Sequence, residues 1–177
     1  MALFRVAIVG HSQIPFDFPD ISRVALRIFR LPGGRLGDFE KDSIFKESFN
    51  WAHDLTILFI GGNDIPALSN ELIVRKLIDL VDRYKALGSR NVVVTLIEPR
   101  EYSLGNRFGI DNELYKHSMN FINRKIKRLS KSRHFRILNI NARPFQYGHT
   151  PDGVHFDLES RYAIIDKMKN CIARHLE

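Results

Sequence analysis

Short apolar runs recur along the chain, and longer segments that mix apolar and polar residues separate them. Each run has six or seven residues and is rich in β-branched or aromatic side chains. Several runs are apolar almost throughout, which is typical of parallel strands that are covered on both faces. We therefore expect strands at 4–9, 24–29, 55–60, 91–97 and 135–140.

The segments between these runs show the spacing of amphipathic helices. In 70–87, apolar residues such as Ile73, Leu77 and Val81 share one face, whereas the charged residues fall largely elsewhere. Gly88 directly follows this segment, where a C-cap glycine is expected. Comparable patterns predict further helices at 36–49, 111–130 and 158–176.

Strand and helix patterns alternate through most of the chain, which predicts an α/β fold with a parallel sheet and helices on both sides. The 177 residues are enough to bury a substantial core, and their hydrophobic fraction of 44% is ordinary for a globular domain. No internal repeat, low-complexity tract or long linker interrupts the pattern. We therefore expect a single domain over 1–177.

The composition argues against several classes of protein. The single cysteine, Cys171, rules out an internal disulfide framework and a thiolate metal cluster. The first residues, MALFRVAIVG, lack the basic region, long apolar core and small-residue cleavage site of a signal peptide. No apolar run approaches the roughly 20 residues that span a bilayer. These features predict a cytoplasmic location and no transmembrane segment.

The net charge of +7 favours polyanions non-specifically, whether nucleic acid, anionic membrane or acidic glycan. Segment 123–136 concentrates this charge, because it carries seven cations and no acidic residue. Both a solvated helix face and an anion-binding patch fit such a run. No zinc-finger spacing or aromatic RNA-binding motif accompanies it. The candidate patch residues for nucleic acid or an anionic membrane surface are Arg124, Lys127, Arg128 and Lys131.

Turns with chemically useful residues follow four of the five predicted strands. They are GHS (10–12), PGGRLG (32–37), GGND (61–64) and, after a loop, TPDGVHF (150–156). Ligands of open α/β sheets bind beyond the carboxyl ends of the strands, so these turns should converge on one rim. Together they supply a hydroxyl, glycine amides, an amide side chain, a carboxylate and an imidazole. This set matches an acyl-transfer site, with a nucleophile, oxyanion donors, an orienting acid and a base.

The same four blocks resemble those of the SGNH hydrolases, also called GDSL-type esterases and lipases. That family is named for a serine, a glycine, an asparagine and a histidine in separate blocks. The resemblance runs from Gly10 to Phe156 in family order, and GGND followed by DGVHF is its most specific part. His11 departs from the pattern, since most members have aspartate there. The GHS block, together with IEPR at 97–100, is similar to SGNH domains encoded by some eukaryotic mobile elements.

The resemblance implies a three-layer α/β/α sandwich of flavodoxin-like topology, with a five-stranded parallel sheet in the order 2-1-3-4-5. It also implies a serine esterase that hydrolyses carboxylic esters, acetyl or short-acyl, through an acyl-enzyme without metal or cofactor. Ser12 would be the nucleophile, His155 the base and Asp152 the residue that orients the imidazole. The oxyanion would be held by the amides of Ser12 and Gly34 and by the Asn63 side chain.

Some positions leave alternatives. Gly33 could replace Gly34 as an amide donor, and Gly153 is expected to relax the turn before the histidine. His11 could support its turn through hydrogen bonds, or it could tune the site with a partial positive charge. Taken singly, each block is also an ordinary turn or helix cap.

Two further hypotheses belong to other classes. His149, Asp152 and His155 recur every three residues and could in principle ligate zinc, although no second cluster supplies a fourth ligand. Alternatively, a catalytically weak or inactive module of the same fold would use its basic surface to bind nucleic acid or anionic lipid.

One segment offers candidate residues for binding the substrate. Segment 98–110 contains Arg100, Tyr102, Arg107 and Phe108. These residues could line the entrance and favour an anionic or extended acyl substrate, with Arg100 and Tyr102 as the binding candidates. A plain surface loop is the alternative.

Overall fold

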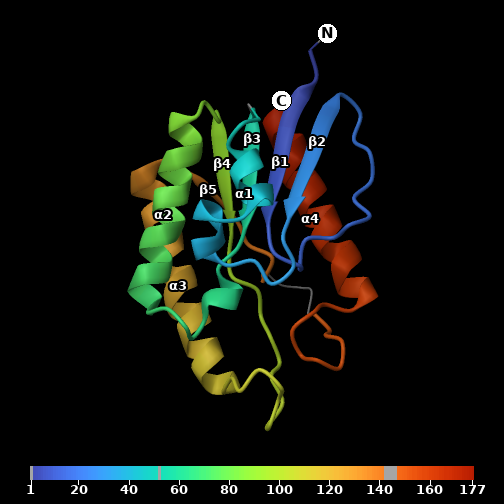
Figure 1. Ribbon diagram of the computed structural model, residues 1–177. Coiled ribbons are helices and arrows are strands. Elements are labelled where there is room, and N and C mark those ends of the chain that lie inside the picture. Colours follow the sequence, from blue (N-terminus) through green and yellow to red (C-terminus); the bar gives the residue numbers. More distant parts are fainter. Residues whose placement is uncertain (1, 52, 142–146) are drawn as a thin grey trace.

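The computed structural model of the protein describes residues 2–51, 53–141 and 147–177 (Figure 1). Within these residues, one sheet contains five strands, which are β1 (Phe4–Gly10), β2 (Val24–Arg30), β3 (Leu55–Phe59), β4 (Asn91–Thr95) and β5 (Arg136–Leu138). Their order is β2-β1-β3-β4-β5, and each neighbouring pair is parallel. The predicted α/β class and the sheet order implied by the resemblance are therefore confirmed.

Helices cover both faces of the sheet (Figure 1). Their bounds are α1 (Ser43–Ser48), α2 (Asn70–Ala86), α3 (Asn112–Arg133) and α4 (Leu158–Leu176). The core on one face joins α1, α2 and α3 to the sheet, and the core on the other face joins α4 to it. The result is the expected three-layer sandwich. No helix in the described ranges has the length and apolar character needed to cross a membrane.

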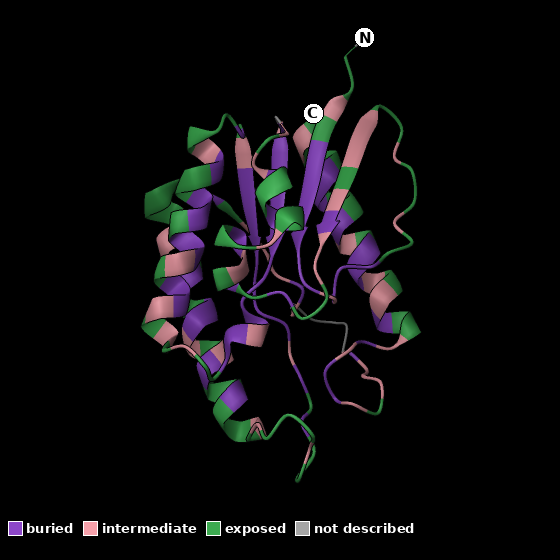
Figure 2. Ribbon diagram, in the orientation of Figure 1, coloured by how far each residue is buried: buried purple, intermediate pink, exposed green. Residues whose placement is uncertain are grey.

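Strand β1 lies in the middle of the core and is covered on both sides (Figure 2). Ala7 and Val9 pack with the layer of α1, α2 and α3, whereas Val6 and Ile8 pack with α4. All four side chains are completely buried. A strand between two helix layers needs apolar residues at every position, which explains why this run shows no polar alternation.

The segment predicted as one helix at 36–49 is divided in two. A 3-10 helix, η1 (Leu36–Glu40), comes first, and α1 begins only at Ser43. Asp42 precedes α1, and its carboxylate accepts a hydrogen bond from the Ile44 amide at 2.8 Å. An aspartate in this N-cap position satisfies the amides that a starting helix leaves unpaired, so it begins a new helix inside the apolar pattern. Gly88, in contrast, adopts φ +98° after α2, as predicted for a C-cap glycine.

The topology fixes where a site can form. Strand β1 lies between β2 and β3, so the connections that follow β1 and β2 leave in opposite directions. A crevice for ligands opens at such a switch point, beyond the carboxyl ends of the strands. Gly10 ends β1 at this edge of the sheet, and a Cβ on it would overlap the Phe59 carbonyl of β3. The GHS turn and a short 3-10 turn, η2 (Gly62–Asp64), lie side by side there as a result.

Candidate active site

The GHS turn carries Ser12 beyond β1, where its side chain meets the loop between β5 and α4. The Ser12 Oγ lies 3.1 Å from Nε2 of His155, although 143 residues separate the two in the chain. On the other side of the imidazole, Nδ1 of His155 lies 2.6 Å from Oδ2 of Asp152. The hydroxyl, the imidazole and the carboxylate thus form one continuous chain of contacts. In such an arrangement a histidine can take the proton of a serine hydroxyl.

Several donors hold the Asp152 carboxylate in place. Its Oδ1 accepts hydrogen bonds from the backbone amides of Val154 and His155 and from the Thr150 hydroxyl, at 2.9 to 3.0 Å. Partial burial alone would raise the pKa of Asp152, but the hydrogen bonds from His155, Val154 and Thr150 hold that pKa well below its usual range. The carboxylate is therefore ionised at neutral pH and can stabilise the imidazolium that forms when His155 takes a proton.

The turn between this aspartate and the histidine requires glycine. Gly153 adopts φ +69°, a left-handed conformation, and a Cβ on it would overlap the Glu101 carbonyl. The Glu101 amide donates to the Gly153 carbonyl at 2.8 Å, which ties the turn to the segment after β4. The expectation that Gly153 relaxes this turn is confirmed.

Gln13 joins the loops of the serine and the histidine, a role that the sequence analysis missed. Its side-chain nitrogen donates to the Val154 carbonyl, and its Oε1 accepts a hydrogen bond from the Phe156 amide at 3.3 Å. Gln13 is buried and follows Ser12 directly, so these bonds hold the two loops in register. A polar residue directly after the serine, at the end of a buried strand, was the only signal available in the sequence.

The candidate oxyanion donors lie in the turns after β1, β2 and β3. The Ser12 amide has no hydrogen-bond acceptor among the residues that the structure describes. Asn63, in η2, donates from Nδ2 to the Gly34 carbonyl at 3.0 Å, which leaves its second amide hydrogen for another acceptor. The Gly34 amide donates to the Leu31 carbonyl at 2.9 Å. The structure thus brings Asn63 and Gly34 together, with the carbonyl of Gly34 facing the asparagine.

Asp64 ends the GGND block and points into the protein. It is 2% exposed, and its carboxylate accepts a hydrogen bond from the Leu36 amide at 3.1 Å. Burial raises the pKa of Asp64 to about 6, although the Leu36 hydrogen bond opposes this shift. Asp64 therefore connects the turns after β2 and β3, and it does so at an electrostatic cost when ionised.

Arg100 and Tyr102 lie elsewhere than the sequence predicts. Instead of lining an entrance or lying on an exposed loop, they are 3% and 5% exposed. The Arg100 guanidinium donates to the Tyr102 hydroxyl at 2.8 Å and to Oε1 of Glu98 at 2.6 Å. Glu98 is itself completely buried, and a charged arginine enters a core when a carboxylate meets it there. In the sequence, the signal for this buried pair was a glutamate and an arginine two residues apart in IEPR, shortly after a buried strand.

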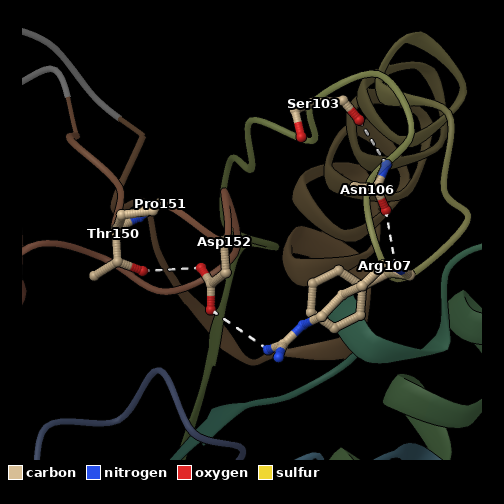
Figure 3. A pocket seen from close by; sticks show the side chains of 7 residues that line it. Ser103, Asn106, Arg107, Thr150, Pro151 and Asp152 are labelled. Carbon is tan, nitrogen blue, oxygen red and sulfur yellow. Dashed lines mark hydrogen bonds and ion pairs between the residues drawn. The ribbon is translucent and has the colours of Figure 1, made fainter.

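The exposed part of the same segment lines a hollow of about 560 Å³ beside the aspartate (Figure 3). Its lining residues are Ser103, Asn106, Arg107, Phe108, Thr150, Pro151 and Asp152. The Arg107 side chain points toward Asp152, and its guanidinium lies 4.0 Å from Oδ2 (Figure 3). The hollow therefore offers space for part of a small ligand at the Asp152 end of the chain of contacts, whereas Ser12 and His155 are not among its lining residues.

His149 binds backbone instead of joining a metal site. Its Nε2 lies 2.9 Å from the Pro99 carbonyl. Across the described ranges, no group of three His, Cys, Asp or Glu side chains is arranged to hold a metal ion. The zinc alternative built on His149, Asp152 and His155 thus finds no ligand set there.

The predicted basic patch lies on α3, away from Ser12, His155 and Asp152. All four of its residues are exposed, namely Arg124, Lys127, Arg128 and Lys131. Helix α3 begins near the carboxyl ends of the strands and returns to the start of β5, so these cations lie toward the opposite end of the sheet. Arg128 and Lys131 border a groove with Val74, Phe121 and Leu129 at the contact of α2 with α3.

Comparison with known proteins adds the class of fold. No protein-family model matches the sequence, and no curated protein matches it in sequence. A solved GDSL-like lipase from Bacteroides thetaiotaomicron has a TM-score of 0.71 at 18% identity, covering 96% of this chain and 88% of that one. A member of the lipolytic protein G-D-S-L family from Veillonella parvula has a TM-score of 0.73 at 14% identity, covering 97% and 99% of the two chains.

A third structural match is a carbohydrate esterase family 3 protein from Talaromyces cellulolyticus, with a TM-score of 0.74 at 15% identity. That alignment covers 97% of each chain. The protein therefore has the fold of the SGNH and GDSL-like hydrolases. Its predicted serine, histidine and aspartate meet at the edge of the sheet where this class of fold binds ligands.

Proposed function

We propose that the protein is a serine esterase of SGNH type that hydrolyses carboxylic esters of acetyl or other short acyl groups. The observation that carries this proposal is the chain of contacts from the Ser12 hydroxyl through His155 to the Asp152 carboxylate. A serine hydroxyl is a weak nucleophile by itself, and this arrangement supplies the base and the orienting carboxylate that it needs. The hydrolase fold of the structural neighbours supports the same conclusion.

In the proposed reaction, Ser12 Oγ attacks the carbonyl carbon of the ester while its proton passes to Nε2 of His155. Asp152 holds the Nδ1 hydrogen and stabilises the imidazolium. The tetrahedral oxyanion accepts hydrogen bonds from the Ser12 amide and from the second Nδ2 hydrogen of Asn63. The Gly34 amide already donates to the Leu31 carbonyl, so Gly33 is the proposed third contributor in its place. The carbon–oxygen bond to the alcohol then breaks, and His155 returns the proton to the leaving alcohol. Water, activated by the same histidine, hydrolyses the acyl-enzyme.

The hollow beside Asp152 is the proposed place for the part of the substrate that extends away from Ser12. Phe108 and Pro151 offer apolar contact there, and Arg107 offers a cation to an anionic group. Because they are buried, Arg100 and Tyr102 do not take the substrate-binding role that the sequence suggested.

His11 in the GHS block and the IEPR segment support a narrower version of the proposal. In this version, the protein belongs with the esterase domains of eukaryotic mobile elements. A cytoplasmic location, as expected from the first residues, stays a prediction.

A fluorophosphonate probe tests the proposal directly. Wild-type protein should be labelled, and the Ser12→Ala variant should not, because the probe phosphonylates an activated serine. Hydrolysis of p-nitrophenyl acetate should fall in parallel for Ser12→Ala and His155→Ala. The exposed Ser132→Ala variant, on α3, is the matched control for the serine substitution. If wild-type protein is not labelled at Ser12, the esterase proposal is wrong.

A binding role for the basic patch is the second candidate, favoured by the exposure of all four patch cations on α3. Single-stranded RNA affinity should then fall steeply with salt concentration, because bound cations release counterions from phosphates. Lys127→Gln with Arg128→Gln should weaken binding more than Arg75→Gln with Lys76→Gln, which remove the same charge from α2. Equal losses for the two double variants would mean that this surface is only a solvated helix face.

A further inference from the structure

We infer that Arg100 and Glu98 are positioning residues of the proposed oxyanion hole, and that His11 connects the serine turn to the same carboxylate. This inference rests on the proposed esterase function, because it assigns a role within that site. None of the three side chains reaches the space of the substrate, since all are at most 3% exposed. They act on the donors of the oxyanion hole from inside the protein.

Arg100 fixes the orientation of the Asn63 side chain. Its Nη2 donates to Oδ1 of Asn63 at 2.9 Å, on the side of the amide opposite to the donor nitrogen. With Oδ1 held in this way, Nδ2 must point toward the Gly34 carbonyl and the proposed oxyanion. Rotation by half a turn would present the asparagine oxygen to the developing negative charge, which would repel it, and Arg100 opposes this rotation together with the Gly34 carbonyl.

Glu98 in turn fixes the guanidinium. Its Oε1 accepts from Nη2 of Arg100 at 2.6 Å and from Nε at 3.1 Å, while Nη1 of Arg100 is held by Tyr102. Burial would raise the pKa of Glu98, but the neighbouring His11 and Arg100 lower it to about 2, so the pair stays ionised. A buried ion pair is weak grounds for stability, since apolar residues of similar volume often serve as well. The Arg100 guanidinium, in contrast, contacts Glu98, Tyr102 and Asn63 together. These three contacts fix its orientation, which is what keeps the Asn63 donor pointing at the proposed oxyanion.

The GGND block is built to admit this pair. A Cβ at Gly62 would overlap the Glu98 carboxylate and lie 2.8 Å from Nη2 of Arg100. Gly62 has no left-handed backbone that would explain the glycine by itself. The absent side chain therefore makes room for the ion pair directly beneath Asn63.

His11 brings the serine turn onto the same carboxylate. Its Nδ1 accepts a hydrogen bond from the Gln13 amide at 3.3 Å, and its Nε2 is the ring nitrogen that faces Glu98. That Nε2 lies 3.3 Å from Oε1, the oxygen that also holds Arg100. His11, which precedes Ser12, and Arg100, which holds Asn63, thus both lie against a single buried carboxylate oxygen. Most SGNH hydrolases have an aspartate at position 11. Here Glu98 supplies the carboxylate, so a histidine at this position suits the site.

Arg100→Lys is the primary test, because it keeps the charge beside Glu98 but removes the fork that reaches Asn63 and Tyr102 together. For p-nitrophenyl acetate we expect kcat to fall about 10- to 100-fold, somewhat less than the loss of a whole donor, with KM changed less than about threefold. On an Asn63→Ala background, the same substitution should cost at most about twofold, because the aimed group is gone. Arg83→Lys is the matched control, since Arg83 pairs with Glu40 at the same 2.6 Å but on the surface.

A second variant distinguishes a loss of positioning from misfolding caused by an unpaired buried charge. Glu98→Gln with Arg100→Gln removes both charges, so no unpaired charge stays buried, and it should show the same fall in kcat. The inference is overturned if either folded variant keeps kcat within about twofold of wild type, or if Arg100→Lys costs as much without Asn63 as with it. Wild-type protein that fails to react with the fluorophosphonate refutes the esterase proposal instead, and the inference with it. Labelled wild type with unaffected Arg100 variants refutes the inference alone.

Discussion

Replacing Asp64 by asparagine should change how the stability of the protein depends on pH. The Asp64 carboxyl is buried under the GGND turn, and burial raises its pKa from 3.8 to about 6. Because the folded state holds the proton more tightly than the unfolded chain, this group stabilises the fold most below the unfolded value of 3.8. That stabilisation is lost as the pH rises through about 6.

The size of the effect follows from the two pKa values. With a pKa of 3.8 unfolded and about 6 folded, the carboxyl adds about 2 kcal/mol more to the free energy of unfolding at about pH 4.5 than at about pH 7.5. Asparagine can still accept the Leu36 hydrogen bond through its side-chain oxygen, but it does not titrate. Wild type should therefore gain about 2 kcal/mol relative to Asp64→Asn when the pH is lowered between these values.

Urea unfolding of both proteins at the two pH values measures this difference. Comparing wild type with the variant removes the contribution of every other titrating group, including Asp152 and Glu98, whose pKa values are lowered. Asp79→Asn, on the exposed face of α2, controls for the removal of a carboxylate. If the stability difference between wild type and Asp64→Asn is the same at both pH values, Asp64 is not a buried, destabilised carboxylate and the reasoning fails.

Three further predictions concern the loop that carries His155. Asp152→Asn should lower kcat by a factor on the order of 10⁴ in the p-nitrophenyl acetate assay, because the imidazole loses its orienting charge, and a loss below tenfold would contradict the proposed role. Gln13→Ala should lower both kcat and the melting temperature, because it removes the hydrogen bonds that hold the backbone on either side of His155. If both values are unchanged, the Gln13 hydrogen bonds are dispensable. Gly153→Ala should destabilise the fold by about 1 to 3 kcal/mol in urea unfolding, because φ +69° and the Glu101 carbonyl both oppose a Cβ; a neutral substitution would argue against the tight turn.

Local sequence patterns predicted the strands and helices correctly wherever the same faces of an element stay covered along its whole length. Runs such as 4–9 and 55–60 predicted strands because both of their faces are covered, and segment 70–87 predicted a helix because only one of its faces is. The pattern failed at 36–49, where the apolar spacing continues but Asp42 starts a new helix. Side-chain capping competes with helix continuation there, and hydrophobic periodicity does not report on it.

The sequence by itself determined the alternation of elements, the residues at the strand ends, and hence that a hydroxyl, an imidazole, a carboxylate and an amide would share one edge of the sheet. These properties depend on spacing along the chain and on the rule that parallel strands point the same way. Only the tertiary structure decided which groups touch. It placed Gln13 across the histidine loop and buried Arg100 against Glu98 beneath Asn63, whereas Arg107 stayed at the hollow. Whether a charge is buried depends on the partner that faces it across the fold, and no local pattern contains that partner.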